Sequence, residues 1–179
     1  MQVISGSLRG LKLDSIKNPD VRPTKDRIKK SLFDIIRFRI KDKIFLELFG
    51  GTGQIGIEAF SQGANKVIIV ESDKENSDII KKNIGKIKSN NEIYFYNTDA
   101  LSFLDDSSIK CDIVFLDPPY KDLELLEKTF KKIEHLDSIP EIVIVETLSS
   151  QVMPEETEKF NLQKTHKYGK ISLNLYERK

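Results

Sequence analysis

The sharpest chemical signal in the sequence is the run Asp117-Pro118-Pro119-Tyr120, which directly follows an apolar stretch. Proline has no backbone N–H, so this segment presents mainly carbonyl oxygens, and Asp117 adds carboxylate acceptors. These acceptors suit the NH2 group of a nucleic-acid base, because binding its protons leaves the nitrogen lone pair freer to attack a methyl carbon. The ring of Tyr120 offers a stacking surface worth about 1–3 kcal/mol. A proline turn with a packed tyrosine is the structural alternative, but the position after a strand favours all four residues as catalytic.

A glycine-rich run from Leu46 to Gly56 is the second signal, and it joins an apolar strand to a helix. It contains the spacing G-x-G-x-x-G, and Glu71 lies about 20 residues further on, where a ribose-binding acid is expected. The pattern fits NAD enzymes, FAD enzymes and methyltransferases alike. Glu47 favours the last class, because an acid there would repel a pyrophosphate but suits a cofactor with an amino acid and a sulfonium cation. We therefore expect S-adenosylmethionine, although Glu47 could also be a strand-end surface residue.

Asp99 follows the third expected strand, where the adenine of the cofactor would lie, and it could equally be the N-cap of a short helix over residues 100–105. Asp73 competes in the same way with Glu71, as a helix cap. The residues expected to bind the cofactor are Glu47, Phe49, Gly50, Gly51, Gly53, Glu71, Ser72, Asp99 and Ala100.

The elements that must position these residues alternate between strand and helix from residue 43 onward. Continuous apolar strands separated by helices indicate an α/β fold, a mostly parallel sheet covered on both faces. The short Tyr168-Gly169 turn predicts that the last two strands form an antiparallel hairpin at the sheet edge. The expected strands are 44–48, 66–71, 92–97, 111–116, 140–146, about 162–166 and about 170–177, and the main helices are 25–39, 54–62, 74–88 and 121–135.

The N-terminal part differs from the rest in charge. Residues 1–45 carry 12 Lys and Arg against 5 Asp and Glu, whereas residues 46–179 carry 17 against 23. A basic segment on an acidic body indicates a polyanion-binding face apart from the small-molecule site, although a solvated lysine-rich helix would look the same. We expect a β-hairpin extension over residues 1–24, with Thr24 as the N-cap of a basic helix whose polar face carries Lys29, and a cofactor-binding domain over residues 25–179.

Composition narrows the class of protein further. The 179 residues are 39% hydrophobic and 32% charged, which indicates one globular domain. No run approaches the roughly 20 apolar residues that span a bilayer, and the N-terminus has no apolar signal core, so we expect a cytoplasmic protein. Cys111 is the single cysteine and is expected to be a buried thiol. With two separated histidines and one cysteine, no zinc site of the usual ligands is expected.

The chain resembles the RsmD-type 16S rRNA (guanine-N2)-methyltransferases nearly from end to end. The features that carry the resemblance are Ser5 to Leu13, Arg22-Pro23-Thr24-Lys25-Asp26-Arg27, Leu48 to Gly53, Glu71, Asp117 to Tyr120, and Tyr168-Gly169. Three positions depart from the usual pattern. Glu47 stands where aspartate is more common, Gly50 where alanine is, and Tyr120 where phenylalanine often is.

The resemblance implies a Rossmann-like class I methyltransferase with a seven-stranded sheet, which transfers a methyl group from S-adenosylmethionine to N2 of a guanine. It implies 16S rRNA as the partner, within a partly assembled small ribosomal subunit, and we expect a monomer without membrane contact. The expected RNA-binding residues are Arg9, Arg22, Thr24, Arg27 and Lys30.

Other readings stay open. The same tetrad occurs in DNA adenine-N6 enzymes, although 179 residues leave little room for a DNA target-recognition domain. Cytosine-N4, another rRNA guanine and a protein glutamine are alternative acceptors. An NAD- or FAD-dependent oxidoreductase would need a substrate domain after the sheet. A non-catalytic rRNA-binding assembly factor would keep the pocket without turnover.

Overall fold

A seven-stranded sheet forms the centre of the computed structural model, which describes residues 1–15, 23–90, 92–120 and 122–179. Its strand order is β3-β2-β1-β4-β5-β7-β6. The strands are β1 (Ile44–Leu48), β2 (Lys66–Val70), β3 (Ile93–Tyr96), β4 (Ile113–Leu116), β5 (Ile142–Leu148), β6 (Phe160–Tyr168) and β7 (Ile171–Arg178). The helices are α1 (Pro23–Ile36), α2 (Gln54–Ser61), α3 (Lys74–Gly85), α4 (Ala100–Phe103) and α5 (Leu123–Glu134).

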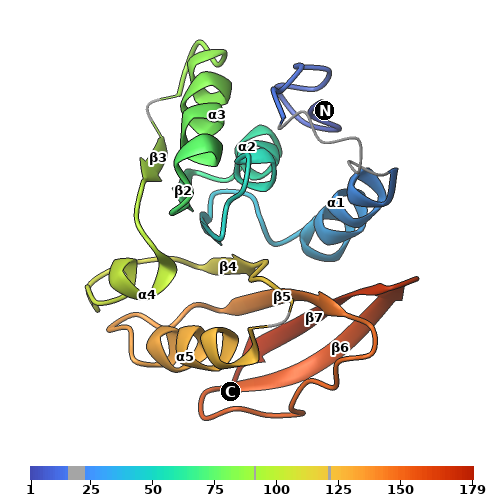
Figure 1. Ribbon diagram of the computed structural model, residues 1–179, viewed down its shortest axis with the longest axis vertical. Coiled ribbons are helices and arrows are strands. Elements are labelled where there is room, and N and C mark those ends of the chain that lie inside the picture. Colours follow the sequence, from blue (N-terminus) through green and yellow to red (C-terminus); the bar gives the residue numbers. More distant parts are fainter. Residues whose placement is uncertain (16–22, 91, 121) are drawn as a thin grey trace.

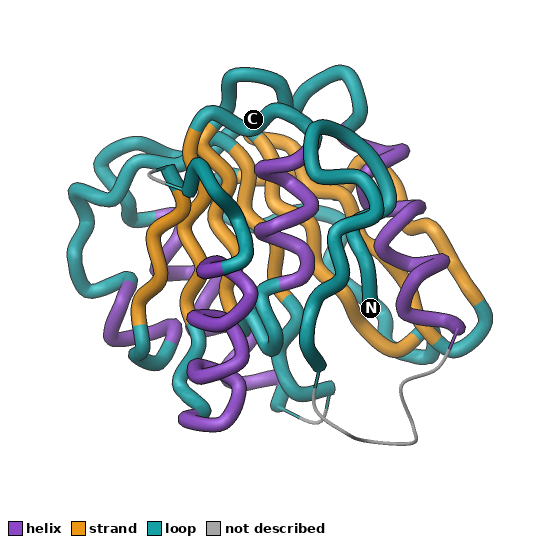
Figure 2. The backbone as a smooth tube through the Cα atoms, turned by 90° about the horizontal axis from the view of Figure 1, so that it is seen from above, coloured by secondary structure: helices purple, strands orange, loops and turns teal. Residues whose placement is uncertain are grey.

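The pairing of the strands confirms the expected α/β fold with a C-terminal hairpin. The strands β1 to β5 pair in parallel, whereas β7 lies antiparallel between β5 and β6. The order reverses at β1, since β2 pairs on one side of it and β4 on the other. Figure 2 shows the strands side by side in the middle of the molecule, with helices around them. Ligands of open α/β sheets bind outside the carboxyl ends of the strands at such a switch point.

Alternation along the parallel strands divides the interior into two cores. Phe45, Ile69 and Ile113 belong to a cluster on the face covered by α1, α2 and α3, whereas Leu46 and Val114 belong to a cluster on the face of α4 and α5. Figure 1 shows these two groups of helices on opposite sides of β4. Strands buried on both faces are uniformly apolar, which is why the parallel strands could be recognised from the sequence.

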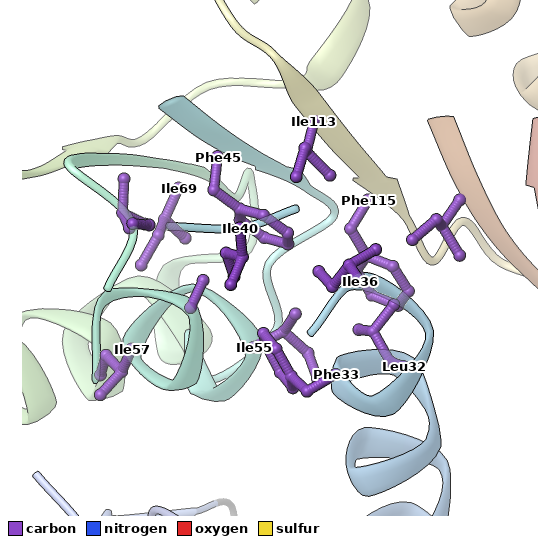
Figure 3. Close-up of a cluster of buried hydrophobic side chains, with 14 of the residues drawn as sticks. Leu32, Phe33, Ile36, Ile40, Phe45, Ile55, Ile57, Ile69, Ile113 and Phe115 are labelled. Atoms are coloured by element: carbon purple, nitrogen blue, oxygen red, sulfur yellow. The ribbon is translucent and has the colours of Figure 1, made fainter. Parts of the chain in front are cut away.

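Helix α1 runs antiparallel to the neighbouring strands. Ile36 lies beside Phe115 (Figure 3). Just after the helix, Arg39 pairs with Glu177 of β7, which lies opposite Ile142 at the amino end of β5. The chain then enters β1 at Ile44. The C-terminal end of α1 therefore lies toward the amino ends of the strands, and its first turns point toward their carboxyl ends.

A buried ion pair fixes the N-terminal segment to the sheet domain. Lys29 of α1 and Glu58 of α2 are 1% and 0% exposed and lie 3.3 Å apart. The Lys29 Nζ also donates to the carbonyl of Gln2 at 2.8 Å, and the Glu58 carboxylate accepts the backbone N–H groups of Ile4 and Ser5. Two helices and the first residues of the chain thus share one network.

This network corrects the prediction for Lys29, which was expected on the exposed polar face of the helix. The prediction for Thr24 is also wrong in part: α1 begins at Pro23, so Thr24 lies inside the first turn and is not the N-cap. Proline suits the first helical position because its missing N–H has no intrahelical partner there. The hairpin expected before the helix takes the form of a single antiparallel bridge between Gln2 and Lys12.

Element boundaries differ from the expectations where tertiary contacts decide them. Strand β5 continues to Leu148 because β7 pairs with it along that whole length. Helix α3 stops at Gly85, three residues early, and the side chain of Asn90 donates to the carbonyl of Ile84 at its end. Cys111 is buried as expected, and burial raises the pKa of its thiol to about 12. Across the described part of the chain, no helix has the length and apolarity to cross a membrane.

Candidate active site

Four acids stand at the carboxyl ends of the parallel strands. Glu47 is in β1, Glu71 follows β2, Asp117 follows β4 and Glu146 is in β5. Each has the same parity as the strand residues that face α1, α2 and α3, because side chains alternate along a strand. The acids are close enough to interact, since Asp117 and Glu71 both raise the pKa of Glu47. The switch-point edge of the sheet is therefore an acidic rim that favours cations and hydrogen-bond donors.

Glu47 is the most deeply buried of the four, at 2% exposure. Its Oε2 accepts the backbone N–H of Gly56 in α2 at 2.9 Å. Burial, followed by the charge of Asp117, raises its pKa to about 8, against the opposing effect of that hydrogen bond. The alternative of a strand-end surface residue is wrong. A carboxyl group with this raised pKa would lose its proton readily beside a bound cation, because a nearby positive charge favours the ionised form.

Glu71 joins the glycine loop to the next helix. Its Oε2 accepts the N–H of Gly51 at 2.7 Å, and its Oε1 accepts the N–H of Asp73 at 2.7 Å. Asp73 itself caps α3 by accepting from the N–H of Asn76. The sequence left open which of the two acids caps the helix. In the structure Asp73 caps α3, and Glu71 orients the glycine loop. Each carboxylate oxygen has two lone pairs, so these bonds leave Glu71 able to accept further donors.

The glycine loop is shaped by close approach and by left-handed backbone. Phe49 and Gly51 have φ of 63° and 55°. A Cβ at Gly50 would come within 2.6 Å of Ile69, and one at Gly56 within 2.7 Å of the same side chain. These two glycines let the loop and α2 press against β2, which is the close helix–strand packing expected of this fingerprint.

The ligand-facing side of the loop shows room for a cofactor. A Cβ at Gly51 would meet no described atom within 4 Å. Helix α2 begins after Gly53, and the N–H of Gly56 in its first turn already donates to Glu47. The Oε1 of Gln54 is buried without a partner among the described atoms. Open space beside Gly51 and an unsatisfied acceptor on Gln54 both fit a polar group bound over this loop.

Asp99 caps α4, accepting the N–H of Ser102 at 2.9 Å. The cap is thus established, while contact with a cofactor stays a prediction. Ser72 is exposed and Ala100 is buried beside this cap. Both follow carboxyl ends of strands on the β2–β3 side of the switch point, so the expected cofactor residues do gather along one edge of the sheet.

The Asp-Pro-Pro-Tyr loop connects β4 to α5. Pro118 is buried, and the carbonyl of Pro119 accepts the N–H of Asp122 at 2.9 Å. Asp122 caps α5 through the N–H of Leu125. Tyr120 is 37% exposed, and its hydroxyl donates to Oε1 of Glu146 at 2.7 Å. The loop is therefore held at both ends and keeps one aromatic ring at the surface.

Glu146 is a site residue that the sequence analysis missed. It closes the apolar run of β5 as Glu71 closes that of β2, and this signal was available in the sequence. It could not be weighed there, because only the β4–β5 register, which pairs Leu116 with Val145, brings Asp117 and Glu146 to the same level.

The expected RNA-binding residues lie on the first part of the chain. Arg9, Arg27 and Lys30 are exposed. Arg22 lies outside the described residues, and of Thr24 only the backbone position in α1 is described. Within the described ranges, no cluster of His, Cys, Asp or Glu could hold a metal ion.

The strand order and the loops at the carboxyl edge are those of the Rossmann-like methyltransferases. A putative methyltransferase from Escherichia coli, yhhF, has the same fold, with a TM-score of 0.88 and 29% identity over 100% of this chain and 98% of its own. The putative methyltransferase SMU.776, solved in complex with SAH, has a TM-score of 0.67 at 12% identity over 88% of this chain and 50% of its own, which shows the fold alone.

Within this class, the chain belongs to the family described as "Conserved hypothetical protein 95", the RsmD family, whose model matches residues 1–177. A relative from Escherichia coli (strain K12), "Ribosomal RNA small subunit methyltransferase D", is 31% identical over 99% of this chain and 90% of its own length. The "Putative rRNA methyltransferase YlbH" of Bacillus subtilis (strain 168) is 29% identical over the full length of both. The resemblance inferred from the motifs is confirmed.

Proposed function

We propose that this protein transfers a methyl group from S-adenosylmethionine to the exocyclic N2 amine of a guanine in 16S rRNA. The observation that carries the proposal is the acidic rim. There the Asp-Pro-Pro-Tyr loop, whose oxygens can accept hydrogen bonds from an amine, meets a glycine loop with two buried acids at one edge of the sheet. The relatives support methylation of small-subunit rRNA, the broader part of this proposal, because one of them is named as an rRNA small-subunit methyltransferase.

Glu47, Gly51 and Glu71 would hold the cofactor, with Asp99 at the adenine end. When bound, S-adenosylmethionine supplies an electrophilic methyl group on a sulfonium cation. The buried carboxylates of Glu47 and Glu71 favour that positive charge, because opposite charges attract strongly in a site shielded from water. The Oε1 of Gln54, which has no partner among the described atoms, offers a further acceptor there.

Asp117 and the proline carbonyls would accept the N–H protons of the target amine. This orients the nitrogen lone pair toward the methyl carbon, and alignment of this kind supplies much of the rate in a bimolecular transfer. The amine loses its proton only after it gains the methyl group, so no strong base has to act first. Asp117, which is half-buried, would take that proton. Tyr120 would stack on the base.

The basic face of α1 would bind the RNA backbone. The first turns of α1 point toward the carboxyl edge of the sheet, and Arg27 and Lys30 are exposed on them. Phosphates near these residues would bring a base to the Asp-Pro-Pro-Tyr loop. The substrate we propose is the 16S rRNA of a partly assembled small subunit in the cytoplasm, bound by a monomer.

The substrate class is tested by offering the purified protein tritiated methyl donor with four acceptors in parallel. These are small subunits from cells that lack the enzyme, naked 16S rRNA, unmethylated DNA and a protein extract. We expect label in rRNA, most of all in the small subunits. Label in DNA or protein alone would overturn the proposal, and cofactor binding without any transfer would favour a non-catalytic assembly factor.

A further inference from the structure

One contact in the site has no part in the transfer step described above. The hydroxyl of Tyr120 donates to Oε1 of Glu146 at 2.7 Å. The β4–β5 register brings Asp117 to the same level on the adjacent strand. Two carboxylates therefore stand side by side next to the ring on which the base would stack. Burial, and then the charge of Glu146, raises the pKa of Tyr120, so the phenol keeps its proton and remains the donor.

A pair of neighbouring acceptors fits one base better than the others. In guanine, the N2 amine is flanked by N1–H, so two donor groups lie side by side on the Watson–Crick edge. The amine of adenine is flanked by the N1 lone pair, and that of cytosine by the N3 lone pair. An ionised carboxylate only accepts, so it attracts N1–H of guanine and repels either lone pair.

We propose that Glu146 is a specificity-determining residue that accepts N1–H of the target guanine while its other contact holds Tyr120 in place. This inference rests on the proposed function, since it presupposes that the base amine binds at Asp117. A carboxylate offers about four lone-pair sites, so the bond from Tyr120 is compatible with further donors. Discrimination arises partly from repulsion of the wrong base, a general route to specificity.

The test uses 2-aminopurine, which keeps the 2-amino group of guanine but has no hydrogen on N1. Small subunits are assembled on ligated rRNA that carries guanine or 2-aminopurine at the methylated position, and kcat/KM is measured for each. We expect wild-type protein to prefer guanine by about 100-fold or more, because a site built to bind an N–H group rejects an analogue that lacks it.

Glu146→Gln separates base recognition from the intrinsic reactivity of the analogue. Glutamine can still accept from Tyr120 through its carbonyl oxygen, but its NH2 group can donate to the N1 lone pair of 2-aminopurine. We expect the preference for guanine to shrink by at least about 10-fold in this variant. Tyr120→Phe is the matched control: it removes the bond to Glu146 but leaves the carboxylate, so the preference should persist.

Methylation of 2-aminopurine by the wild type at nearly the rate of guanine would overturn the inference and leave the proposed function intact. An unchanged preference in a folded Glu146→Gln variant would also overturn it. Even if that variant does not fold, the wild-type ratio can still overturn the inference. Absence of guanine methylation by the wild type would instead contradict the proposed function itself.

Discussion

At the scale of single residues, the site is defined by carboxylates in very different surroundings. Glu47 is buried and bonded to an N–H group of α2, and Glu71 accepts two backbone N–H groups. Asp117 is half-buried at the rim. Environment sets the role of each acid. The sequence could identify Glu47 and Glu71 from their spacing to the glycine loop and Asp117 from the Asp-Pro-Pro-Tyr run, but it could not show which of these acids water reaches.

Asp117→Ala should abolish most of the transfer while the cofactor still binds. We expect kcat to fall by at least about 100-fold, since one group that handles the amine proton is lost, and the Kd of the cofactor to change only a few-fold. Single-turnover rates measure the loss of transfer, and calorimetry measures the Kd of the cofactor. Asp122→Ala in the same loop is the control: it removes the α5 cap, which should cost about 1 kcal/mol of stability and leave the rate within a few-fold. Equal rates in the two variants would refute the role of Asp117.

Glu47→Gln should change how stability depends on pH. The pKa of Glu47 is about 8 in the folded chain, against 4.5 as the ordinary value. Between these values the unfolded state holds fewer protons, so the free energy of unfolding of the wild type falls as pH rises. Below this range Glu47 is protonated in both the folded and the unfolded state, so it no longer makes the free energy of unfolding depend on pH. Glutamine can still accept from Gly56 and carries no charge.

The stability gained by Glu47→Gln over the wild type should therefore grow from about pH 5 to pH 8, by on the order of 3 kcal/mol. Urea unfolding of the cofactor-free protein at several pH values measures this difference. A difference that stays constant across the range would show that Glu47 ionises at an ordinary pKa.

At the scale of elements, the sequence predicted the parallel strands and their order of appearance well, because strands covered on both faces are apolar throughout. It predicted the ends of elements less well. The expected N-terminal hairpin contains only one antiparallel bridge among the described residues, and β5 is longer than predicted because it pairs with β7 as far as Leu148. Both outcomes depend on partners far away in the sequence. Burial of Lys29 was missed for the same reason: its partner Glu58 lies on another helix.

Two helical glycines should respond in opposite ways to alanine. A Cβ at Gly56 would lie 2.7 Å from Ile69 and 2.8 Å from Glu47, whereas one at Gly85 would meet nothing within 4 Å. Gly56→Ala should therefore cost about 1–3 kcal/mol through overpacking and weaken cofactor binding. Gly85→Ala should be neutral or stabilising by up to about 1 kcal/mol, as expected from helix propensity. Thermal unfolding compares them, and identical Tm values would argue against close packing of α2 on β2.

At the scale of the whole molecule, the basic N-terminal part and the acidic edge of the sheet form two neighbouring surfaces of opposite charge. The basic first 45 residues are tied to an acidic body through the buried Lys29–Glu58 pair, and the first turns of α1 face the same edge as the acids. The sequence predicted the charge asymmetry but not the attachment. This arrangement lets one surface hold a polyanion while the rim next to it stays selective for donors and cations.

Reversing charge on α1 should weaken RNA binding without affecting the cofactor. For Arg27→Glu with Lys30→Glu we expect lower rRNA affinity and a salt dependence of log K smaller by about 2. Lys110→Glu is the matched control, since Lys110 is exposed shortly before β4, at the opposite edge of the sheet. Filter binding at several salt concentrations measures both. RNA affinity that falls equally in the control would place the interface elsewhere.

The central claim is methyl transfer to N2 of guanine, and identification of the labelled nucleoside tests it most directly. Small subunits from cells that lack the enzyme are incubated with the protein and tritiated methyl donor, and the rRNA is digested to nucleosides and separated. We predict that the label is N2-methylguanosine and that Asp117→Ala abolishes it. Label in N6-methyladenosine, in a methylated cytidine or at another position of guanine would contradict the account.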